Sequence, residues 1–248
     1  MCPPPCFRPT NGARKRTGAR TRKWFPYPPF QIKRLIVHPR SDIVIRVRTY
    51  AFETGETLVL DKTVPYAGLY MRRAPGGVIP QFELPAGYRF ALYNDGDEAA
   101  WAKIESSVLE FDSEFAALMF FKENFIPHSG ELRRRCVFIE TAEGEKVATG
   151  TAWWSDIYGQ RRPWLHWIGV CPEYQGLGLG KAIIARVTKL LTEIEGDVPI
   201  YLKTQTWSYK AIGIYLDCGY EPCGEKLLYR NRKDNLKKAL KVLKRLRR

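Results

Sequence analysis

The chain has 248 residues, 45% of them hydrophobic and 27% charged, so it carries enough apolar side chains for a substantial core. No run of 18 apolar residues exists, which excludes a membrane-spanning helix. The first residues, MCPPPCFRPTNGARKR, lack the apolar stretch of a secretory signal, and we expect a cytoplasmic protein of bacterial type.

The formal net charge of +14 comes from the two ends of the chain. Residues 1–65 contain 13 Lys and Arg against 4 Asp and Glu, and residues 226–248 contain 11 against a single Asp. Residues 66–225 contain 16 against 21 and are mildly acidic. This distribution argues against a central domain that reads nucleic acid. It leaves open a weak contact of the basic ends with RNA, DNA or an anionic membrane surface.

The six cysteines form no Cys-x-x-Cys pair. Four of them lie in segments that have the pattern of packed strands or helices, and two lie near the start of the chain. They are Cys136, Cys171, Cys218 and Cys223, and Cys2 and Cys6. We expect buried thiols rather than a disulfide framework or a metal site, and therefore no metal cofactor.

The first seventy residues differ from the rest in composition. Residues 1–30 are rich in Pro, Arg and aromatic residues without any period, which is typical of a disordered basic tail. Residues 31–70 form an extension of uncertain structure, where strand-like runs at 32–37, 43–50 and 57–60 allow a β-hairpin. The character changes at Met71-Arg-Arg, and we place the main domain at residues 71–230.

Within the main domain the pattern predicts the order β-α-α-β-β-β-α-β-α-β, a mixed α/β sheet flanked by helices. A helix at 97–109 turns Trp101 and Ile104 inward. Asp112-Ser113 caps a second helix, whose predicted apolar face is Phe115, Leu118, Met119 and Phe125. The predicted strands are 88–93, 135–140, 147–154, 164–170, 200–205 and one near 225–229, with a helix at 208–218.

Residues 231–248 form a basic C-terminal helix in this interpretation. Leucines recur at helical spacing on one side, and Lys and Arg occupy the other. These leucines are Leu236, Leu240, Leu243 and Leu246. We expect the helix to dock through them onto the domain or a partner; a helix on a membrane surface and an RNA-binding arm are the alternatives.

The run VCPEYQGLGLGK, residues 170–181, carries the strongest functional signal. A short apolar strand leads into it, and an amphipathic helix follows. Gly176, Gly178 and Gly180 allow backbone N–H groups to converge at a helix N-terminus, where the dipole favours anions such as a pyrophosphate. The spacing fits neither the dinucleotide-binding fingerprint nor the P-loop.

The order Val-x-Pro-x-x-Gln-Gly-x-Gly-x-Gly resembles the acetyl-CoA pyrophosphate loop of the GNAT superfamily of N-acetyltransferases. A second stretch, SYKAIGIYLDCGY at 208–220, is similar to the family's Asn-x-x-Ala-x-x-x-Tyr-x-x-x-Gly-Phe motif. It departs from that motif at Ser208, in place of Asn, and at Tyr220, in place of Phe. Ser208 can still cap the helix that follows.

The resemblance implies a GNAT-type sheet in which the strand before the loop and the strand after its helix splay apart. It implies that acetyl-CoA, the cosubstrate, lies between them, with its thioester carbonyl at the Val170 N–H. The implied cofactor-binding residues are Ile168, Val170, Gln175, Gly176, Leu177, Gly178, Leu179, Gly180, Lys181, Ser208 and Tyr215. Lys181 could instead be a solvated residue of the first helical turn.

Two residues are candidates for catalysis. Tyr215 occupies the family's Tyr position and is the candidate acid, although a helical Tyr also packs in cores. His166 precedes Val170 by four residues, which by a period of two places it on the same face of the strand, and it is the candidate base. The alternative for His166 is a core histidine bonded to backbone. Trp167 and Trp154 are candidates for lining the acceptor pocket.

The resemblance implies an acyltransferase that moves an acetyl group from acetyl-CoA to a primary amine of a small molecule or peptide by direct attack. The alternatives are an acyl-CoA-binding regulatory module, and an acetyltransferase that acts on a protein or RNA-associated acceptor through the basic tails. The sequence identifies neither the acceptor nor the oligomeric state.

Residues 1–70 carry no resemblance to the family and are expected to be dispensable for acetyl transfer. They are either a tethering extension or a product of mis-assigned translation that really begins at Met71. In the competing interpretation, the strands within residues 32–60 pack on the domain and shape the acceptor pocket.

Overall fold

The computed structural model describes residues 60–157, 159–225, 228 and 234–246. All of these residues belong to one unit of the chain, residues 36–248. The predicted tail at 1–30, and the strand-like runs at 32–37, 43–50 and 57–59, lie outside the described residues.

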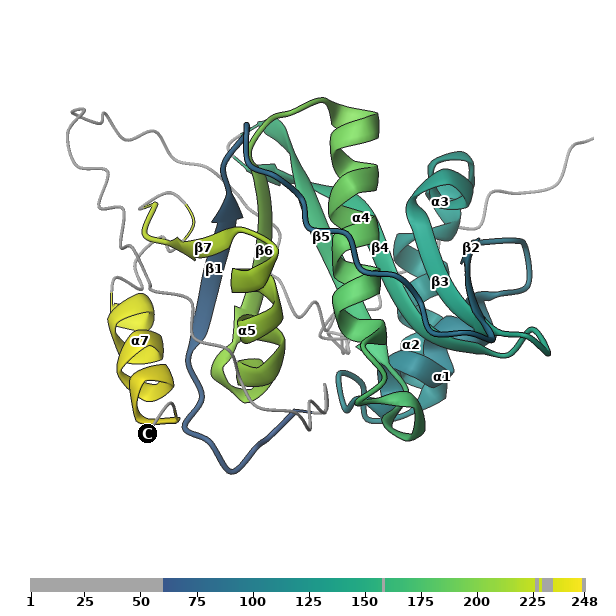
Figure 1. The fold of residues 1–248 in the computed structure, drawn as a ribbon, viewed down its shortest axis with the longest axis horizontal. Coiled ribbons are helices and arrows are strands. Elements are labelled where there is room, and N and C mark those ends of the chain that lie inside the picture. Colours follow the sequence, from purple (N-terminus) through teal and green to yellow (C-terminus); the bar gives the residue numbers. More distant parts are fainter. Residues whose placement is uncertain (1–59, 158, 226–227, 229–233, 247–248) are drawn as a thin grey trace, which may run out of the picture. The chain divides into compact units, whose positions relative to one another are not determined.

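A seven-stranded mixed sheet forms the centre of the fold (Figure 1). The strands are β1 Gly68–Arg73, β2 Tyr88–Leu92, β3 Cys136–Thr141, β4 Lys146–Ile157, β5 Gln160–Val170, β6 Ile200–Gln205 and β7 Tyr220–Cys223. Their order in the sheet is β2-β3-β4-β5-β6-β1-β7. Only β5 and β6 pair in parallel, and every other neighbouring pair is antiparallel. The predicted mixed α/β sheet is confirmed.

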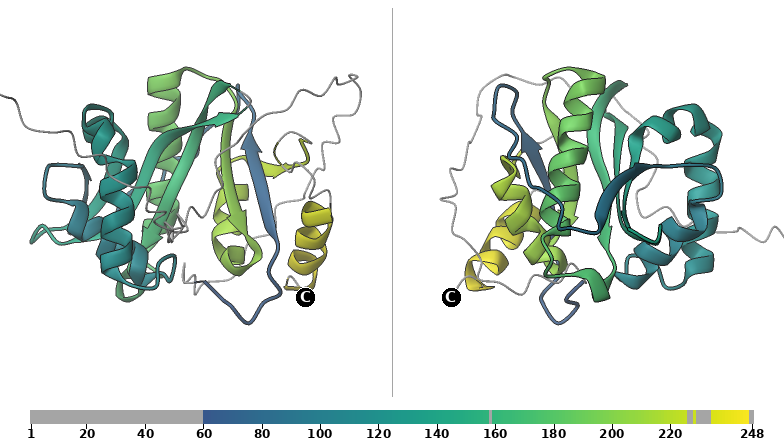
Figure 2. Two further views of the ribbon diagram at one scale, coloured as in Figure 1. Left: turned by 180° about the vertical axis from the view of Figure 1, so that it is seen from behind. Right: turned by 45° about the vertical axis from the view of Figure 1, so that its right-hand side comes forward.

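Helices cover both faces of this sheet. They are α1 Glu98–Ser107, α2 Glu114–Asn124, α3 Ser129–Arg135, α4 Leu179–Glu195, α5 Tyr209–Asp217 and α7 Asp234–Leu246, with short 3-10 turns η1 Ile126–His128, η2 Pro172–Tyr174 and η3 Thr206–Ser208. α4 and α5 lie together on one face, and α1 and α2 lie behind β4 and β5 on the other (Figures 1 and 2). No helix among the described residues is long and apolar enough to cross a membrane.

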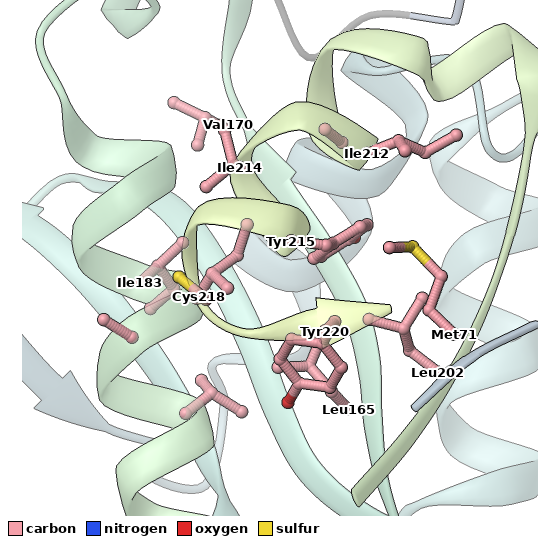
Figure 3. Close-up of a cluster of buried hydrophobic side chains, with 14 of the residues drawn as sticks. Met71, Leu165, Val170, Ile183, Leu202, Ile212, Ile214, Tyr215, Cys218 and Tyr220 are labelled. Atoms are coloured by element: carbon pink, nitrogen blue, oxygen red, sulfur yellow. The ribbon is translucent and has the colours of Figure 1, made fainter. Parts of the chain in front are cut away.

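The strands divide their side chains between two cores because successive residues point to opposite faces. Val137, Ile139 and Leu165 face α4, whereas Phe138 and Trp153 face α1 and α2. α4 is the amphipathic helix predicted after the loop, and most of its predicted apolar face is fully or almost fully buried in the first core: Leu179, Ile183, Ile184, Val187, Leu190 and Leu191. Ile194, the last residue of the predicted face, is partly buried against the same core. Figure 3 shows labelled side chains from β1, β5, β6, β7, α4 and α5 gathered in this core.

β1 was not predicted, and it changes the boundary drawn at Met71. The strand lies inside the sheet, between β6 and β7. Leu69 and Met71 are both fully buried on the α5 side of it. The boundary between residues 70 and 71 therefore falls in the middle of a strand that pairs on both sides. The remaining division of the chain into domains stays a prediction.

Other differences between the predicted and the observed elements are local. α2 buries Ala117 and Phe121, whereas Phe115 and Met119 of its predicted apolar face are 72% and 40% exposed. Ser113 caps this helix as predicted, because its hydroxyl accepts from the Ala116 N–H at 3.2 Å. The last strand is β7 rather than residues 225–229, of which the structure describes only 225 and 228.

The C-terminal helix docks on the domain. α7 contacts β1 and η3, and it buries Ala239, Val242 and Leu243, while Leu236 packs against the same core. Leu246 stays exposed, together with the basic side chains of the helix. The four described cysteines are free thiols and buried, as predicted: Cys136, Cys171, Cys218 and Cys223.

Candidate active site

The glycine-rich turn joins β5 to α4. Gly176 and Gly178 both have φ of +80°, the left-handed region that suits glycine, and Gly178 occupies the N-cap of α4. A Cβ added at either residue would meet nothing within 4 Å. Backbone conformation, not lack of space, therefore requires glycine here, and the turn leaves room in front of the helix N-terminus, where N–H groups lack helical partners.

Side chains hold this turn in place from two directions. Gln175 folds back, and its Nε2 donates to the Val170 carbonyl oxygen at 2.7 Å. The Tyr174 hydroxyl donates to Glu145 at 2.8 Å, and Glu145 in turn accepts from Lys103 of α1 at 3.0 Å. The hydrogen bond from Lys103 and then that from Tyr174 lower the pKa of Glu145. The loop is thus tied to the β3–β4 turn and to α1.

β5 and β6 separate towards the loop. They share a single parallel residue pair, Trp164 with Tyr201, and their ribbons diverge beyond it (Figure 1). On the other side of β5, Cys171 N donates to Val147 O at 2.8 Å. Because hydrogen-bonded and non-bonded pairs alternate in an antiparallel ladder, the neighbouring Val170 N–H points away from β4, towards the opening. The splay implied by the resemblance is present.

A β-bulge interrupts β5 just before this point. The register with β4 shifts between Thr149 and Thr151, so that Trp167 and Ile168 together oppose Gly150. Trp167 has φ of +50°, a strained conformation for a bulky residue. A Cβ at Gly150 would lie 2.6 Å from Ile168 Cδ1, which explains the glycine.

The bulge overturns one prediction about His166. His166 pairs with Thr151, whereas Val170 pairs with Ala148 of the α4-side core. Since paired residues share a face and the extra residue breaks the period of two, His166 lies on the face opposite to Ile168 and Val170. Its predicted position beside them is wrong.

One ring nitrogen of His166 also lacks a hydrogen bond. Its Nε2 is buried and has no hydrogen-bond partner among the described residues. Burial lowers the pKa of His166 from 6.5 to about 3, so the ring is neutral at pH 7 and holds a proton weakly.

Tyr215 lies on α5 within the core that Figure 3 shows, 7% exposed. Burial and then the charge of Glu110 raise the pKa of Tyr215, so its hydroxyl is protonated at neutral pH. Ser208 occupies the N-cap of α5, but its side chain makes no cap hydrogen bond and instead accepts from Gln205 at 3.3 Å. Lys181 Nζ lies 3.8 Å from Asp217 Oδ2 of α5.

The two tryptophans proposed for the acceptor pocket lie apart. Trp167 packs among Trp101, Phe111 and Phe120, with ring centroids 5.0–5.6 Å away. Trp154 pairs with Pro163 towards the other end of β5, where it stacks on Trp153 and Arg161. Only Trp167 lies near the opening.

Sequence reasoning missed two carboxylates near the loop. Glu105 is fully buried on α1, and neither of its oxygens has a hydrogen-bond partner in the described part of the chain. Glu110 follows just after the helix. Helical spacing could have revealed Glu105. It comes four residues after Trp101 and therefore lies on the inward face of the helix, where a charged residue is rare. No group of three His, Cys, Asp or Glu within the described ranges could hold a metal ion.

Residues 81–220, more than half of the chain, match the model of the acetyltransferase (GNAT) family. The chain belongs to this family. No curated protein matches it in sequence.

Forty-nine chains of solved structures are similar. A GCN5-related N-acetyltransferase from Sphaerobacter thermophilus has 18% identity and a TM-score of 0.52, over 64% of this chain and 49% of its own. A GNAT-family acetyltransferase from Colwellia psychrerythraea has 13% identity and a TM-score of 0.49, and the match covers 66% of this chain and 55% of its own. A GCN5-related N-acetyltransferase from Kribbella flavida has 20% identity and a TM-score of 0.42, and the match covers 64% of this chain and 55% of its own. The first of these supports the fold alone, and this chain spans about half the length of each.

Proposed function

We propose that this acyltransferase moves an acetyl group from acetyl-CoA to a primary amine of a small molecule or peptide. The observation that carries the proposal is the opening between β5 and β6, which share one residue pair and end at a turn with Gly176 and Gly178 in the left-handed conformation. This combination offers strand backbone and helix N-terminal N–H groups to one extended anionic ligand.

The residues of the opening fit such a ligand. The space in front of Gly176 and Gly178 suits a pyrophosphate, with N–H groups from Gln175 to Lys181 as donors. Ile168 and Val170 supply strand backbone, and Ser208 lies across the opening on η3. When bound, acetyl-CoA supplies an acetyl group activated as a thioester. The Val170 N–H, directed into the opening, is the donor for the thioester oxygen.

Tyr215 is the proposed acid at the leaving sulfur. Its hydroxyl stays protonated at neutral pH because burial raises its pKa. The role of base, first given to His166, is weakly supported, because a ring with a pKa of about 3 takes a proton poorly from an ammonium.

Gly178→Glu tests the cofactor site. The substitution strains the backbone and places a negative charge where the pyrophosphate would lie, so we expect calorimetry to show no CoA binding. Gly178→Ala separates strain from charge. Gly159→Glu is the matched control, since Gly159 has φ of +75° and equally open surroundings at the far end of β5. CoA binding to Gly178→Glu with wild-type affinity would refute the site.

The regulatory alternative predicts the same CoA binding without turnover. A thiol-release assay over polyamines, amino acids, aminoglycosides and peptides separates the two, because an enzyme releases free CoA with at least one acceptor class. Release only with protein or RNA-associated acceptors would favour the alternative in which the basic tails recruit the acceptor.

A further inference from the structure

Two carboxylates lie within electrostatic reach of each other where α1 ends, Glu105 and Glu110. The helix stops because Leu109 adopts φ of +67°, and this turn brings the Glu110 N–H to the Glu105 carbonyl oxygen at 3.2 Å. A left-handed conformation at a leucine is unfavourable. It persists here in a turn that brings the backbone of Glu110 back to the end of the helix, while Glu110 itself stays exposed.

Glu105 points at the strand that carries the cofactor site. A Cβ at Gly169 of β5 would lie 3.2 Å from Glu105 Oε1 and 2.9 Å from a carbon of Ile104. Gly169 immediately precedes Val170, whose N–H faces the opening. Only a glycine lets the carboxyl approach the strand this closely, so α1 and β5 are matched to each other at this point.

The carboxyl of Glu105 lacks the partners that a buried acid usually has. Both oxygens are inaccessible to solvent and unbonded in the described ranges. Burial and then the charge of Glu110 raise the pKa of Glu105. Among the described residues, the charge of Glu105 also contributes to the raised pKa values of Cys136 of β3 and Tyr215 of α5. Neither of these neighbours is a cation, so a bound cation would supply the partner that the Glu105 carboxyl lacks among the described residues.

Glu110 connects this site to the other side of the opening. Its Oε1 accepts from Gln205 Nε2 at 3.2 Å, and Gln205 ends β6. Glu105, Glu110 and Tyr215 therefore surround the splayed ends of β5 and β6, and the charges of both carboxylates reach the Tyr215 hydroxyl.

A segment outside the family match borders the same place. The strap, residues 60–67, contacts the end of α1 through Leu60 N and Val108 O at 3.5 Å. It contacts η3 through Asp61 N and Trp207 O at 3.0 Å, and the charge of its Lys62 acts on Glu110. The strap thus bridges the two sides of the opening on the side where Glu105 and Glu110 lie.

We propose that Glu105 receives the ammonium group of the acceptor and takes its proton, while Glu110, held by Gln205, helps to position that ammonium. Glu105 is then the catalytic base, and the acceptor is an amine that enters as a cation beside the strap. This inference rests on the proposed function and extends it to the acceptor.

The proton count balances. The ammonium gives one proton to the Glu105 carboxylate, and the freed nitrogen lone pair forms the C–N bond with the acetyl carbon. The C–S bond breaks, and its electron pair stays on sulfur. The second nitrogen proton reaches that sulfur directly or through Tyr215, which gives one proton and receives another. Glu105 releases this proton to solvent before or as the next ammonium binds, so each turnover releases one proton.

The test starts without acetyl-CoA, with n-butylamine as the probe and n-butanol as its uncharged counterpart. Burial raises the pKa of Glu105 and a cation bound beside it would lower that pKa, so binding of the cation should release protons from Glu105. Calorimetry in buffers of different ionisation enthalpy should therefore show proton release on binding of n-butylamine and none with n-butanol. Glu105→Gln should lose this release and the preference for the amine. Glu123→Gln, an exposed residue on α2, is the charge-matched control and should behave as wild type.

Kinetics separate a catalytic Glu105 from a purely structural one. If Glu105 is the base, Glu105→Gln should lower kcat/KM for amines by roughly 10²- to 10⁴-fold, the range for a lost acid–base group, and Glu105→Asp should restore part of kcat/KM. Glu110→Gln should mainly raise KM. Amine binding to Glu105→Gln with wild-type affinity and proton release, or unchanged kcat/KM, would overturn the proposal. CoA binding measured in parallel tests the proposed function separately, since it does not depend on Glu105.

Discussion

The two sides of the opening between β5 and β6 are built in opposite ways. The proposed cofactor side would use backbone groups of one continuous segment, from Val170 through Gly178 into α4. The proposed acceptor side would use the side chains of Glu105, Glu110 and Gln205, and the end of α1 and the end of β6 that carry them are far apart in the sequence. A backbone site tolerates many side chains but needs its glycines, whereas a side-chain site depends on a few residues that different elements bring together.

The two sides also differ in the energetic cost of their geometry. The glycines of the turn reach positive φ with little strain. The proposed acceptor side instead holds Leu109 and Trp167 at positive φ, and it buries the Glu105 carboxyl, which has no hydrogen-bond partner within the described part of the chain. Strained backbone and unsatisfied polar groups concentrate at functional sites, because such costs persist only where function maintains them.

The largest effect is expected from shortening the chain. A protein that begins at Met71 loses the strap and half of β1, including the fully buried Leu69. We expect it to be insoluble or to lose cooperative unfolding, which reverses the prediction that residues 1–70 are dispensable. A protein that begins at Leu60 keeps both elements and should unfold cooperatively, as circular dichroism melting can show. Equal melting temperatures for the two would show that the strap and β1 are peripheral.

The next effect concerns Tyr215, which lies between the two sides. Tyr215→Phe keeps the ring and removes the hydroxyl, so turnover should fall roughly 10²-fold while CoA affinity changes little. Steady-state kinetics and calorimetry measure the two quantities. A parallel loss of CoA affinity would instead place Tyr215 in the cofactor side.

A smaller effect is expected at His166. Its folded pKa of about 3 lies below the ordinary 6.5, so the unfolded chain binds more protons between these values. Stability from the neutral ring is present above pH 6.5 and is lost as the pH falls towards 3, by at most about 1.4 kcal/mol per pH unit. His166→Gln should weaken this acid sensitivity in urea unfolding. It should leave the pH–rate profile between pH 5 and 8 unchanged, and a flattened acidic limb would return the base to His166.

The smallest effect is expected at Tyr220, which stands in place of the Phe of the family motif. Its hydroxyl lies 3.0 Å from Thr188 Oγ1 of α4, and Thr188 itself donates to Ile184 O. Tyr220 is therefore the donor, and Tyr220→Phe should cost about 1 kcal/mol, or a fall of about 2–4 °C in Tm. A double-mutant cycle with Thr188→Val isolates the pair. Additive losses would show that the hydroxyl contact contributes nothing.

The sequence by itself determined the features that depend on neighbouring residues. The turn from Gly176 to Gly180, the apolar stripe of α4 and the cap at Ser113 follow from local conformational preference and helical period, so contiguous residues suffice to predict them. The two motifs also indicated the family, which the match over residues 81–220 confirms.

Only the tertiary structure decided the face of His166, the buried side of α2 and the position of Glu105, because these features depend on contacts between distant segments. The bulge at Trp167 turns His166 to the opposite face, and no period in the sequence reveals an inserted residue. α2 buries Ala117 and Phe121 because the space beneath α1 selects that side, and Phe115 is left outside. Glu105 meets Gly169 only after α1 docks on β5, so the approach of carboxyl and strand is a property of the assembled fold.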